Sequence, residues 1–232
     1  MYTKDFNKPA IIYNDKEYSY GEFLRNIQNF SGLLNINQGD RVAIFSENRP
    51  EWIFGFFAVW NSRGINVPID FLSTPEEVAF IINDCRPAYI FTSSGNLESL
   101  KTALASVDYG PEVIVFDDVR VKGDVPAGNM EPADSDAVAV IIYTSGTTGS
   151  PKGVMLTYEN LYSNVECITV KEGLIALTDR VIAILPFHHA FPLQGTILMP
   201  FYIGSTVVLP AAISSDEIIK TLQKYKITFM LG

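Results

Sequence analysis

Apolar and polar positions follow two different periods along this chain. Short apolar runs bounded by turn residues, such as residues 42–45 and 137–143, are typical of strands buried on both faces. Between such runs, apolar residues recur at spacings of three and four, which is typical of helices with one buried side. Segments that alternate in this way predict an α/β fold with parallel or mixed sheets covered by helices.

The first part of the chain predicts a hairpin followed by a helix. The turn pair Asn14-Asp15 separates two short strand-like segments. Ser19 and Glu22 then have the spacing of a capping box, in which a hydroxyl and a carboxylate satisfy free amides at a helix start. The residues expected on the buried side of this helix are Phe23, Ile27, Phe30 and Leu34.

Three later helices are predicted from their starts or from their composition. Residues 51–61 are apolar almost all round, which predicts a helix inside a large core. Thr74 is expected to cap the start of a second helix, and residues 214–217 are expected to cap the start of a third. The inward side of the second helix is expected to consist of Val78, Ile81, Ile82 and Cys85.

The segment 181–215 lacks charged residues and is long enough to be considered as a membrane span. Its four prolines and two glycines favour a buried strand (181–185), helix (193–203) and strand (206–209) instead, so no membrane span is expected. Residues 227–232 are expected to form a core strand. Because natural ends are usually polar and loose, this strand predicts that the chain is part of a longer protein.

Composition narrows the classes of function. The chain has 232 residues, 47% of them apolar, and a formal net charge of −9, which argues against a broad nucleic-acid or anionic-membrane surface. Its two cysteines, Cys85 and Cys167, form neither a disulfide framework nor a metal quartet with the two histidines. The start shows no signal peptide, so a cytoplasmic location is expected.

Residues 144–153, TSGTTGSPKG, stand out between two strand-like runs. Glycines let backbone N–H groups approach a ligand closely, hydroxyls add donors, and Lys152 adds one mobile positive charge. Together these features suit a polyphosphate at the tip of a hairpin. The common nucleotide loop is a poor match, because Lys152 is followed by Gly153 and not by Ser or Thr. A surface loop that binds nothing is the alternative from composition alone.

The stretch YTSGTTGSPKGVMLTYENL resembles the phosphate-loop signature of the adenylate-forming (AMP-binding) superfamily, which includes acyl-CoA synthetases. The segments YSYGEF, GDRVAIFSENRPEWIFGFFAVWNSRGINVPID and AILPFHHAFPLQGTILMPFYIG resemble other conserved blocks of that superfamily, in the same order. The resemblance implies that residues 1–232 form the first part of the large N-terminal AMP-binding domain. It also implies that the rest of that domain and the small C-terminal domain lie outside this chain.

The resemblance implies an acid–thiol ligase that uses ATP, Mg²⁺ and coenzyme A to convert a carboxylic acid into an acyl-adenylate and then an acyl-CoA. Thr144 matches the position that helps to hold magnesium, and Lys152 matches the catalytic loop lysine. The residues implied to hold the ATP phosphates are Thr144, Ser145, Gly146, Thr147, Thr148, Gly149 and Lys152.

The resemblance also implies an acyl pocket after the motif Leu185-Pro186-Phe187. His189 would line this pocket near the adenylate, with Phe191 and Gly195 as neighbours. The preceding His188 is expected to point away from it, since adjacent residues on a strand face opposite sides. A simple core histidine is the alternative for His189.

The Phe-rich composition of this block and its His-Ala-Phe sequence favour a fatty acid, as for a long-chain fatty acid–CoA ligase, over an amino acid as the substrate. An enzyme that adenylates an amino acid or an aryl acid is an alternative. The adenine- and ribose-binding blocks of the family fall beyond Gly232, so this chain alone is expected to have little or no adenylating activity. The alternative is a non-catalytic module that binds a nucleotide or a partner. Self-association is a further expectation, since aromatic side chains of helix 51–61 and the final strand would be partly uncovered.

Overall fold

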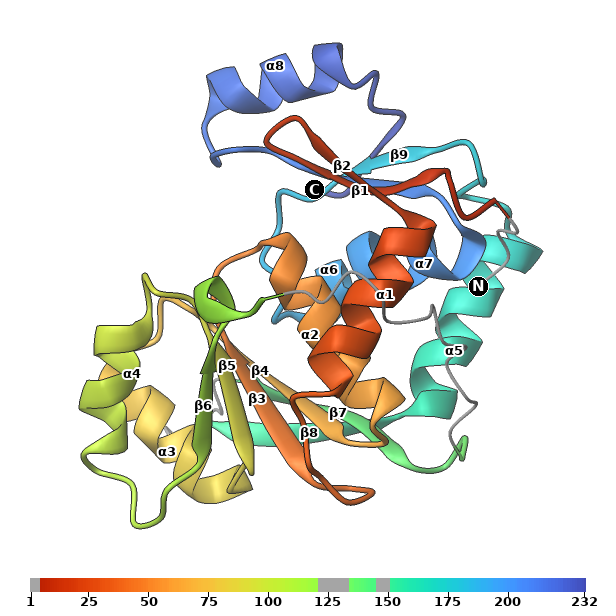
Figure 1. Cartoon of the computed structure of the whole chain (residues 1–232). Coiled ribbons are helices and arrows are strands. Elements are labelled where there is room, and N and C mark those ends of the chain that lie inside the picture. Colours follow the sequence, from red (N-terminus) through yellow and green to blue (C-terminus); the bar gives the residue numbers. More distant parts are fainter. Residues whose placement is uncertain (1–4, 121–133, 145–150) are drawn as a thin grey trace. The chain divides into compact units, whose positions relative to one another are not determined.

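The computed structural model describes residues 5–120, 134–144 and 151–232. The chain divides into two compact units. Unit 1 comprises residues 1–25, 48–50 and 159–232, and unit 2 comprises residues 26–47 and 51–158. The alternation of strands and helices confirms the predicted α/β class (Figure 1).

Unit 2 is built on a six-stranded sheet with the strand order β6-β5-β3-β4-β7-β8. The strands are β3 (Arg41–Phe45), β4 (Ile65–Ile69), β5 (Tyr89–Thr92), β6 (Glu112–Val115), β7 (Val138–Thr144) and β8 (Lys152–Thr157). The first five in this order are parallel, and β8 is antiparallel to β7. The carboxyl ends of β3 to β7 therefore meet at one edge of the sheet.

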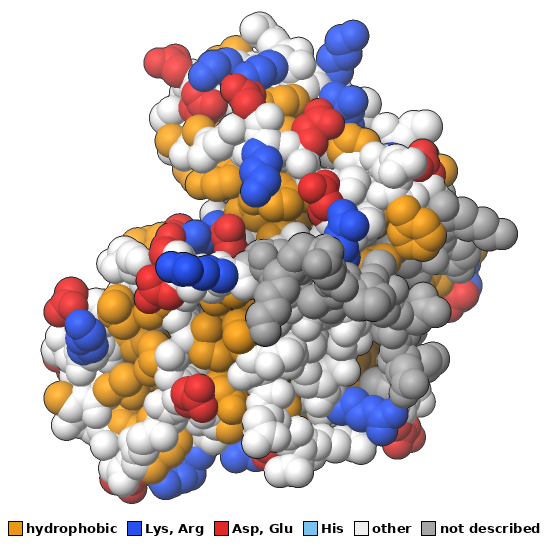
Figure 2. Space-filling model, viewed as in Figure 1, with side chains coloured by type: hydrophobic (Ala, Val, Ile, Leu, Met, Phe, Trp, Pro, Cys, Tyr) orange, Lys and Arg blue, Asp and Glu red, His pale blue; other side chains and the backbone are white. Residues whose placement is uncertain are grey.

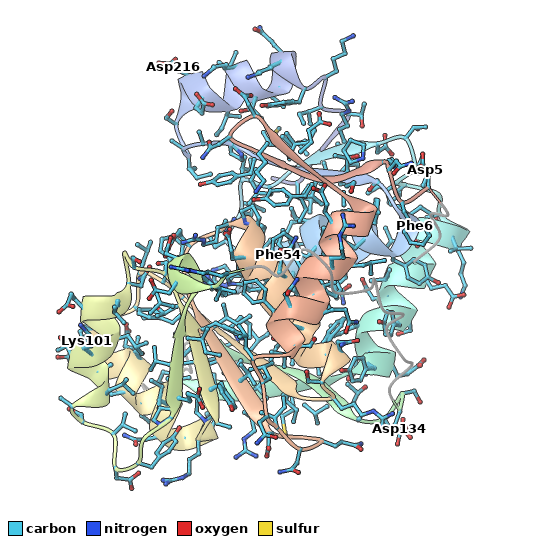
Figure 3. All side chains as sticks on the ribbon, viewed as in Figure 1. Asp5, Phe6, Phe54, Lys101, Asp134 and Asp216 are labelled. Carbon is cyan, nitrogen blue, oxygen red and sulfur yellow. The ribbon has the colours of Figure 1, made fainter. Side chains whose placement is uncertain are left out.

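Helices α3 and α4 lie on one face of this sheet (Figure 1). Helix α3 spans Pro75–Cys85 and helix α4 spans Leu97–Leu104. A separate 3₁₀ turn, η1 (Phe116–Asp118), follows strand β6. The capping box at Thr74 is confirmed, because Glu77 donates its N–H to the Thr74 hydroxyl over 3.3 Å and accepts the Thr74 N–H over 2.9 Å. The predicted inward residues of α3 are all buried. On the outer face of α4, Lys101 pairs with Glu98 over 2.8 Å (Figure 3).

Helix α2 (Pro50–Asn61) is the interior helix that its composition predicted. Trp52 stacks on Phe56 with ring centroids 5.3 Å apart, and Trp60 donates its indole N–H to the Ala139 carbonyl over 2.9 Å. Phe54 points inward from this helix (Figure 3). The expectation that the aromatic side chains of α2 would be partly uncovered is wrong, because each of them is at least nine-tenths buried.

Unit 1 contains a five-stranded sheet with the order β11-β9-β10-β1-β2. The strands are β1 (Pro9–Tyr13), β2 (Lys16–Ser19), β9 (Arg180–Ile182), β10 (Thr206–Leu209) and β11 (Phe229–Met230). The predicted β1–β2 hairpin is confirmed. Its turn residues Asn14 and Asp15 have φ angles of 49° and 63°, as the left-handed conformation of a tight hairpin turn requires.

Helix α1 (Tyr20–Ser31) starts in unit 1 at the predicted capping box. Ser19 donates its N–H to the Glu22 carboxylate over 2.8 Å, and Glu22 donates its N–H to the Ser19 hydroxyl over 3.2 Å. Phe23, Ile27 and Phe30 are buried as predicted. The prediction for Leu34 is wrong, since the helix ends before it and Leu34 is only partly buried.

The other helices of unit 1 come after strand β8 in the sequence. They are α5 (Tyr158–Glu166), the π-helical turn η2 (Cys167–Lys171), α6 (Ala190–Pro192), the π-helical stretch η3 (Leu193–Leu198), α7 (Met199–Ile203) and α8 (Ser215–Lys224). Figure 1 shows α8 on one face of the five-stranded sheet and α7 on the other. The surface over α8 carries charges of both signs (Figures 2 and 3), including Asp216 in its first turn. Ser214 caps α8 as predicted.

Two predictions for the second half of the chain need correction. Strand β9 ends at Ile182, so residues 183–185 are not part of it. The final segment forms a two-residue strand at the sheet edge rather than a core strand, and Met230 is 53% exposed. The reason is that β11 pairs with β9 on one side, and no other described strand pairs with it. None of the described helices has the length and apolarity needed to cross a membrane.

Candidate functional site

The two ends of the motif at residues 144–153 belong to strands β7 and β8 of unit 2. Thr144 is the last residue of β7 and Lys152 is the first of β8, and the two are paired in register. Both residues are exposed. Side chains opposite each other in an antiparallel pair project from the same face, so the Thr144 hydroxyl and the Lys152 ammonium share one side of the hairpin. Residues 145–150, which include Ser145, Gly146, Thr147, Thr148 and Gly149, lie outside the described residues.

Thr144 ends its strand at the edge where the carboxyl ends of the parallel strands meet. In open α/β sheets, ligands bind outside this edge. The same edge in unit 2 carries other polar side chains. Ser93, which follows β5, donates its hydroxyl to the carboxylate of Glu47 over 2.7 Å. The N–H of Ser94 donates to the carboxylate of Asp117 over 2.8 Å.

Tyr143 lies on the other face of the hairpin, directly before Thr144. Its ring packs against the core beneath α3, and its hydroxyl donates a hydrogen bond to the carboxylate of Asp84 at the end of that helix. Burial raises the pKa of Tyr143 well above its ordinary value, and the hydrogen bond to Asp84 raises it further. The hydroxyl therefore stays protonated, and it fixes the end of β7 to α3.

Gly153 is paired in register with Tyr143. Because glycine has no side chain, the side chains of Ile141 and Tyr143 can pack directly against the backbone of Gly153. A Cβ at this position would lie 2.8 Å from Cγ2 of Ile141 and 3.2 Å from Cζ of Tyr143. Neither Tyr143 nor Gly153 was predicted from the sequence to have this role. A signal was present, because an isolated glycine inside a strand-like run indicates the close approach of a neighbouring group.

Strand β8 is more exposed than its apolar residues suggest. Val154 is 44% exposed and Met155 is 65% exposed. These side chains are exposed because β8 is the edge strand of the six-stranded sheet, where it pairs only with β7 among the described strands. Strand β7 is likewise not covered on both faces along its whole length, because Ile141 and Tyr143 are only partly buried.

The second group of predicted residues lies in unit 1, around the start of the long helical stretch α6–η3–α7. His188 and His189 lie in a turn and not on a strand, and their rings are 4.1 Å apart. The expectation that they point opposite ways is therefore wrong. His188 is buried, whereas His189 is exposed at the N-cap position of α6, with extended backbone. An exposed ring at this position argues against a simple core role for His189.

Phe191 and Gly195 follow within the same helical stretch. Phe191 is 59% exposed, whereas Gly195 is buried. Leu231 lies directly against Gly195. The structure thus holds His189, Phe191 and Gly195 within one short segment of unit 1, and it holds Thr144 and Lys152 at the hairpin of unit 2.

Magnesium would find few protein ligands among the described residues. No group of three or more His, Cys, Asp or Glu side chains suited to a metal occurs in the described ranges. A single hydroxyl, such as that of Thr144, fits an ion that keeps several waters and binds mainly to substrate phosphates, which is the usual mode of Mg²⁺.

Comparison with known proteins extends over nearly the whole chain. Residues 2–232 match the family model described as AMP-binding enzyme. Long chain acyl-CoA synthetase 8 of Arabidopsis thaliana is 30% identical over 90% of this chain and 32% of its own length. 4-Hydroxybutyrate–CoA ligase 2 of Metallosphaera sedula is 29% identical over 99% of this chain and 45% of its own length.

Solved structures agree with this match at the level of the fold. The crystal structure of ATP-bound MatB from Rhodopseudomonas palustris superposes with a TM-score of 0.84 at 23% identity, over 99% of this chain and 47% of that one. The chain therefore spans from 32% to 47% of the length of these three proteins.

Proposed function

This chain belongs to the AMP-binding enzyme family, and we propose that its protein activates a carboxylic acid with ATP and transfers the acyl group to coenzyme A. In this proposal, residues 1–232 are the first part of the large nucleotide-binding domain. The observation that carries the proposal is the register of the β7–β8 hairpin, which puts Thr144 and Lys152 side by side and exposed at the carboxyl edge of a parallel sheet.

The proposed reaction has two steps. A carboxylate oxygen of the acid attacks the α-phosphorus of ATP, the bond to the bridging oxygen breaks, and pyrophosphate leaves. The thiolate of coenzyme A then attacks the acyl carbonyl, and AMP leaves with the electron pair of the broken C–O bond. Both steps move negative charge onto phosphate oxygens, so fixed positive charge and donors next to those oxygens lower the barrier.

We assign charge stabilisation in the first step to Lys152. Its ammonium would face the β- and γ-phosphates, together with the donors of Ser145, Gly146, Thr147, Thr148 and Gly149. Thr144 would hold Mg²⁺ through its hydroxyl, and a bound Mg²⁺ would neutralise phosphate charge. Tyr143 supports this arrangement, because its hydrogen bond to Asp84 fixes the strand that ends at Thr144.

We further propose that the acid is a fatty acid and that it lies beside His189, Phe191 and Gly195. The apolar composition of this segment supports an apolar substrate, and so does the exposed ring of Phe191. The relatives include a long chain acyl-CoA synthetase, a 4-hydroxybutyrate–CoA ligase and a feruloyl-CoA synthase, so the choice of a fatty acid rests on the composition of this segment. His189 would position the acid and the adenylate.

An ATP–pyrophosphate exchange screen of the complete gene product tests both parts of the proposal. The acids are palmitate, 4-hydroxybutyrate, benzoate and phenylalanine. We expect palmitate to support the fastest exchange. Faster exchange with benzoate or phenylalanine would refute the fatty-acid assignment alone. A folded protein that exchanges pyrophosphate with none of a wide panel of carboxylic acids would refute the adenylating function itself.

A further inference from the structure

The segment 183–189 leads from strand β9 to the two histidines of unit 1, and its backbone is irregular. It is nevertheless buried over much of its length, since Phe187 is 1% exposed and His188 is 7% exposed. Backbone polar groups in a buried irregular segment need hydrogen-bond partners as much as those of a strand do. The partners of this segment therefore show what fixes its path.

The end of the segment finds partners in the backbone. The N–H of His189 donates to the Pro186 carbonyl over 3.4 Å, and the His189 carbonyl accepts the N–H of Leu193 over 3.0 Å. These two bonds form the turn that enters α6. Leu185 and Phe187, on either side of Pro186, are bound by a side chain instead.

That side chain is the amide of Asn48, which belongs to unit 1 together with the segment. Asn48 donates from Nδ2 to the Leu185 carbonyl over 2.8 Å, and its Oδ1 accepts the N–H of Phe187 over 3.1 Å. In a parallel sheet, a peptide unit of one strand bonds in the same way to the residues on either side of its partner. The Asn48 amide thus replaces a neighbouring strand beside Pro186.

The chemistry of the asparagine side chain suits this position. Its amide carries a donor and an acceptor on one carbon, and both are used here. Pro186 favours an extended conformation for Leu185, the residue before it. In an extended chain, the carbonyl of Leu185 and the N–H of Phe187 point to the same side, so a single amide can bind both.

The same contacts determine where His189 lies. His189 follows Phe187 by two residues, and its side chain makes no capping hydrogen bond to α6. The place of its exposed ring therefore depends on the backbone that carries it and on the adjacent ring of His188, whose centroid is 4.1 Å away. Asn48 fixes that backbone at Leu185 and Phe187.

We propose that Asn48 is a positioning residue, which holds residues 185–187 so that the His189 ring lies beside the acid. This inference rests on the proposed function, because it needs the acid to lie next to His189. Asn48 does not touch the acid in this proposal. It acts only through the backbone that leads to His189.

The test measures the KM for the acid and the KM for ATP in pyrophosphate exchange by the complete gene product. In Asn48→Ala, the Leu185 carbonyl and the Phe187 N–H lose their partner. We expect the KM for the acid to rise about tenfold, because the loss of such a hydrogen bond changes an equilibrium by about this factor. The KM for ATP should stay near the wild-type value.

This pair of constants distinguishes positioning from a loss of stability. A KM does not depend on the fraction of the enzyme that is folded, so a destabilised variant with an intact site would show a lower apparent kcat and unchanged KM values. Asn48→Asp is a second variant, in case Asn48→Ala does not fold. It keeps the shape and the acceptor for Phe187 but loses the donor to Leu185, and we expect its KM for the acid to rise as well.

Asn96→Ala is the matched control. Asn96 is half-buried like Asn48, and its amide donates to the Phe71 carbonyl over 2.9 Å in unit 2. Its loss should lower the melting temperature and leave the KM for the acid near the wild-type value.

A double variant tests the route through His189. If Asn48 acts through this ring, Asn48→Ala should change the KM for the acid little once His189→Ala is present. Effects of the two changes that simply multiply would contradict the inference.

The other outcomes separate the inference from the proposed function. The inference fails if folded Asn48 variants keep the wild-type KM for the acid, or if the KM for ATP rises as much as the KM for the acid. It also fails if Asn96→Ala raises the KM for the acid as much as Asn48→Ala does. If the wild type is folded and inert toward every acid, the proposed function itself is wrong.

Discussion

Thr144 and Lys152 stand opposite each other in register in the antiparallel pair β7–β8. The pairing makes a hydroxyl and a positive charge project from the same face, although eight positions separate the two residues in the sequence. On the opposite face, Tyr143 lies over Gly153 and reaches Asp84. One face of the hairpin is thus available for chemistry, while the other face holds it in place.

Gly153→Ala should destabilise unit 2. The added methyl group would lie 2.8 Å from Cγ2 of Ile141, so the strand or the Tyr143 ring must shift. Overpacking of this kind costs about 1–3 kcal/mol in the free energy of unfolding, which chemical denaturation measures. Gly110→Ala is the control, since no atom lies within 4 Å of a Cβ there. Equal stability of the two variants would show that the side chains of Ile141 and Tyr143 do not pack tightly against Gly153.

The hydrogen bond from Tyr143 to Asp84 should appear in a double-mutant cycle. Tyr143→Phe and Asp84→Asn each weaken it, and the double variant loses little more than either single one. We expect a coupling free energy of about 1 kcal/mol, measured by urea denaturation. Additive effects would mean that the two side chains do not interact.

In the full protein, Tyr143→Phe should also raise the KM for ATP more than the KM for the acid, because it loosens the strand that ends at Thr144.

Local signals in the sequence were sufficient for the elements whose starts and turns are chemically distinct. The capping boxes at Ser19 and Thr74 and the turn at Asn14-Asp15 are formed by neighbouring residues, so no distant contact is needed to predict them. The interior position of α2 also followed from its composition alone.

Predictions failed where a strand's place in its sheet decides burial. The run at Val154 looks as apolar as a central strand, yet it is exposed because β8 is at the sheet edge. The same is true of Met230 at the edge strand β11. Strand order comes from long-range pairing, which apolar periodicity does not contain. The contact between Gly195 and Leu231 was missed for the same reason.

The capping box at Ser19 predicts a pH dependence of stability. The backbone N–H of Ser19 donates to the Glu22 carboxylate and lowers the pKa of Glu22 below its ordinary value. A lowered pKa in the folded state gives stability that is present above the unfolded pKa, about 4.3 for Glu, and is lost as the pH falls through the folded pKa.

This dependence is measured by the free energies of unfolding of the wild type and Glu22→Gln between neutral and acid pH. The wild type should be the more stable of the two at neutral pH. The difference should shrink as the pH falls below about 4.3. A constant difference across that range would contradict the role of the Glu22 carboxylate.

We propose that the β7–β8 hairpin holds the pyrophosphate end of ATP, and the direct test of this role is the variant Lys152→Met. Two quantities are measured on the complete gene product: the rate of ATP–pyrophosphate exchange and the affinity for the acid. The control variant is Lys101→Met on α4, because the ion pair that Lys101 forms with Glu98 is exposed. We expect exchange to fall about 10²-fold in Lys152→Met while its affinity for the acid stays near the wild-type value. Lys101→Met should exchange pyrophosphate at a rate near that of the wild type. Wild-type exchange in Lys152→Met, or lost acid affinity with retained turnover, would contradict this role.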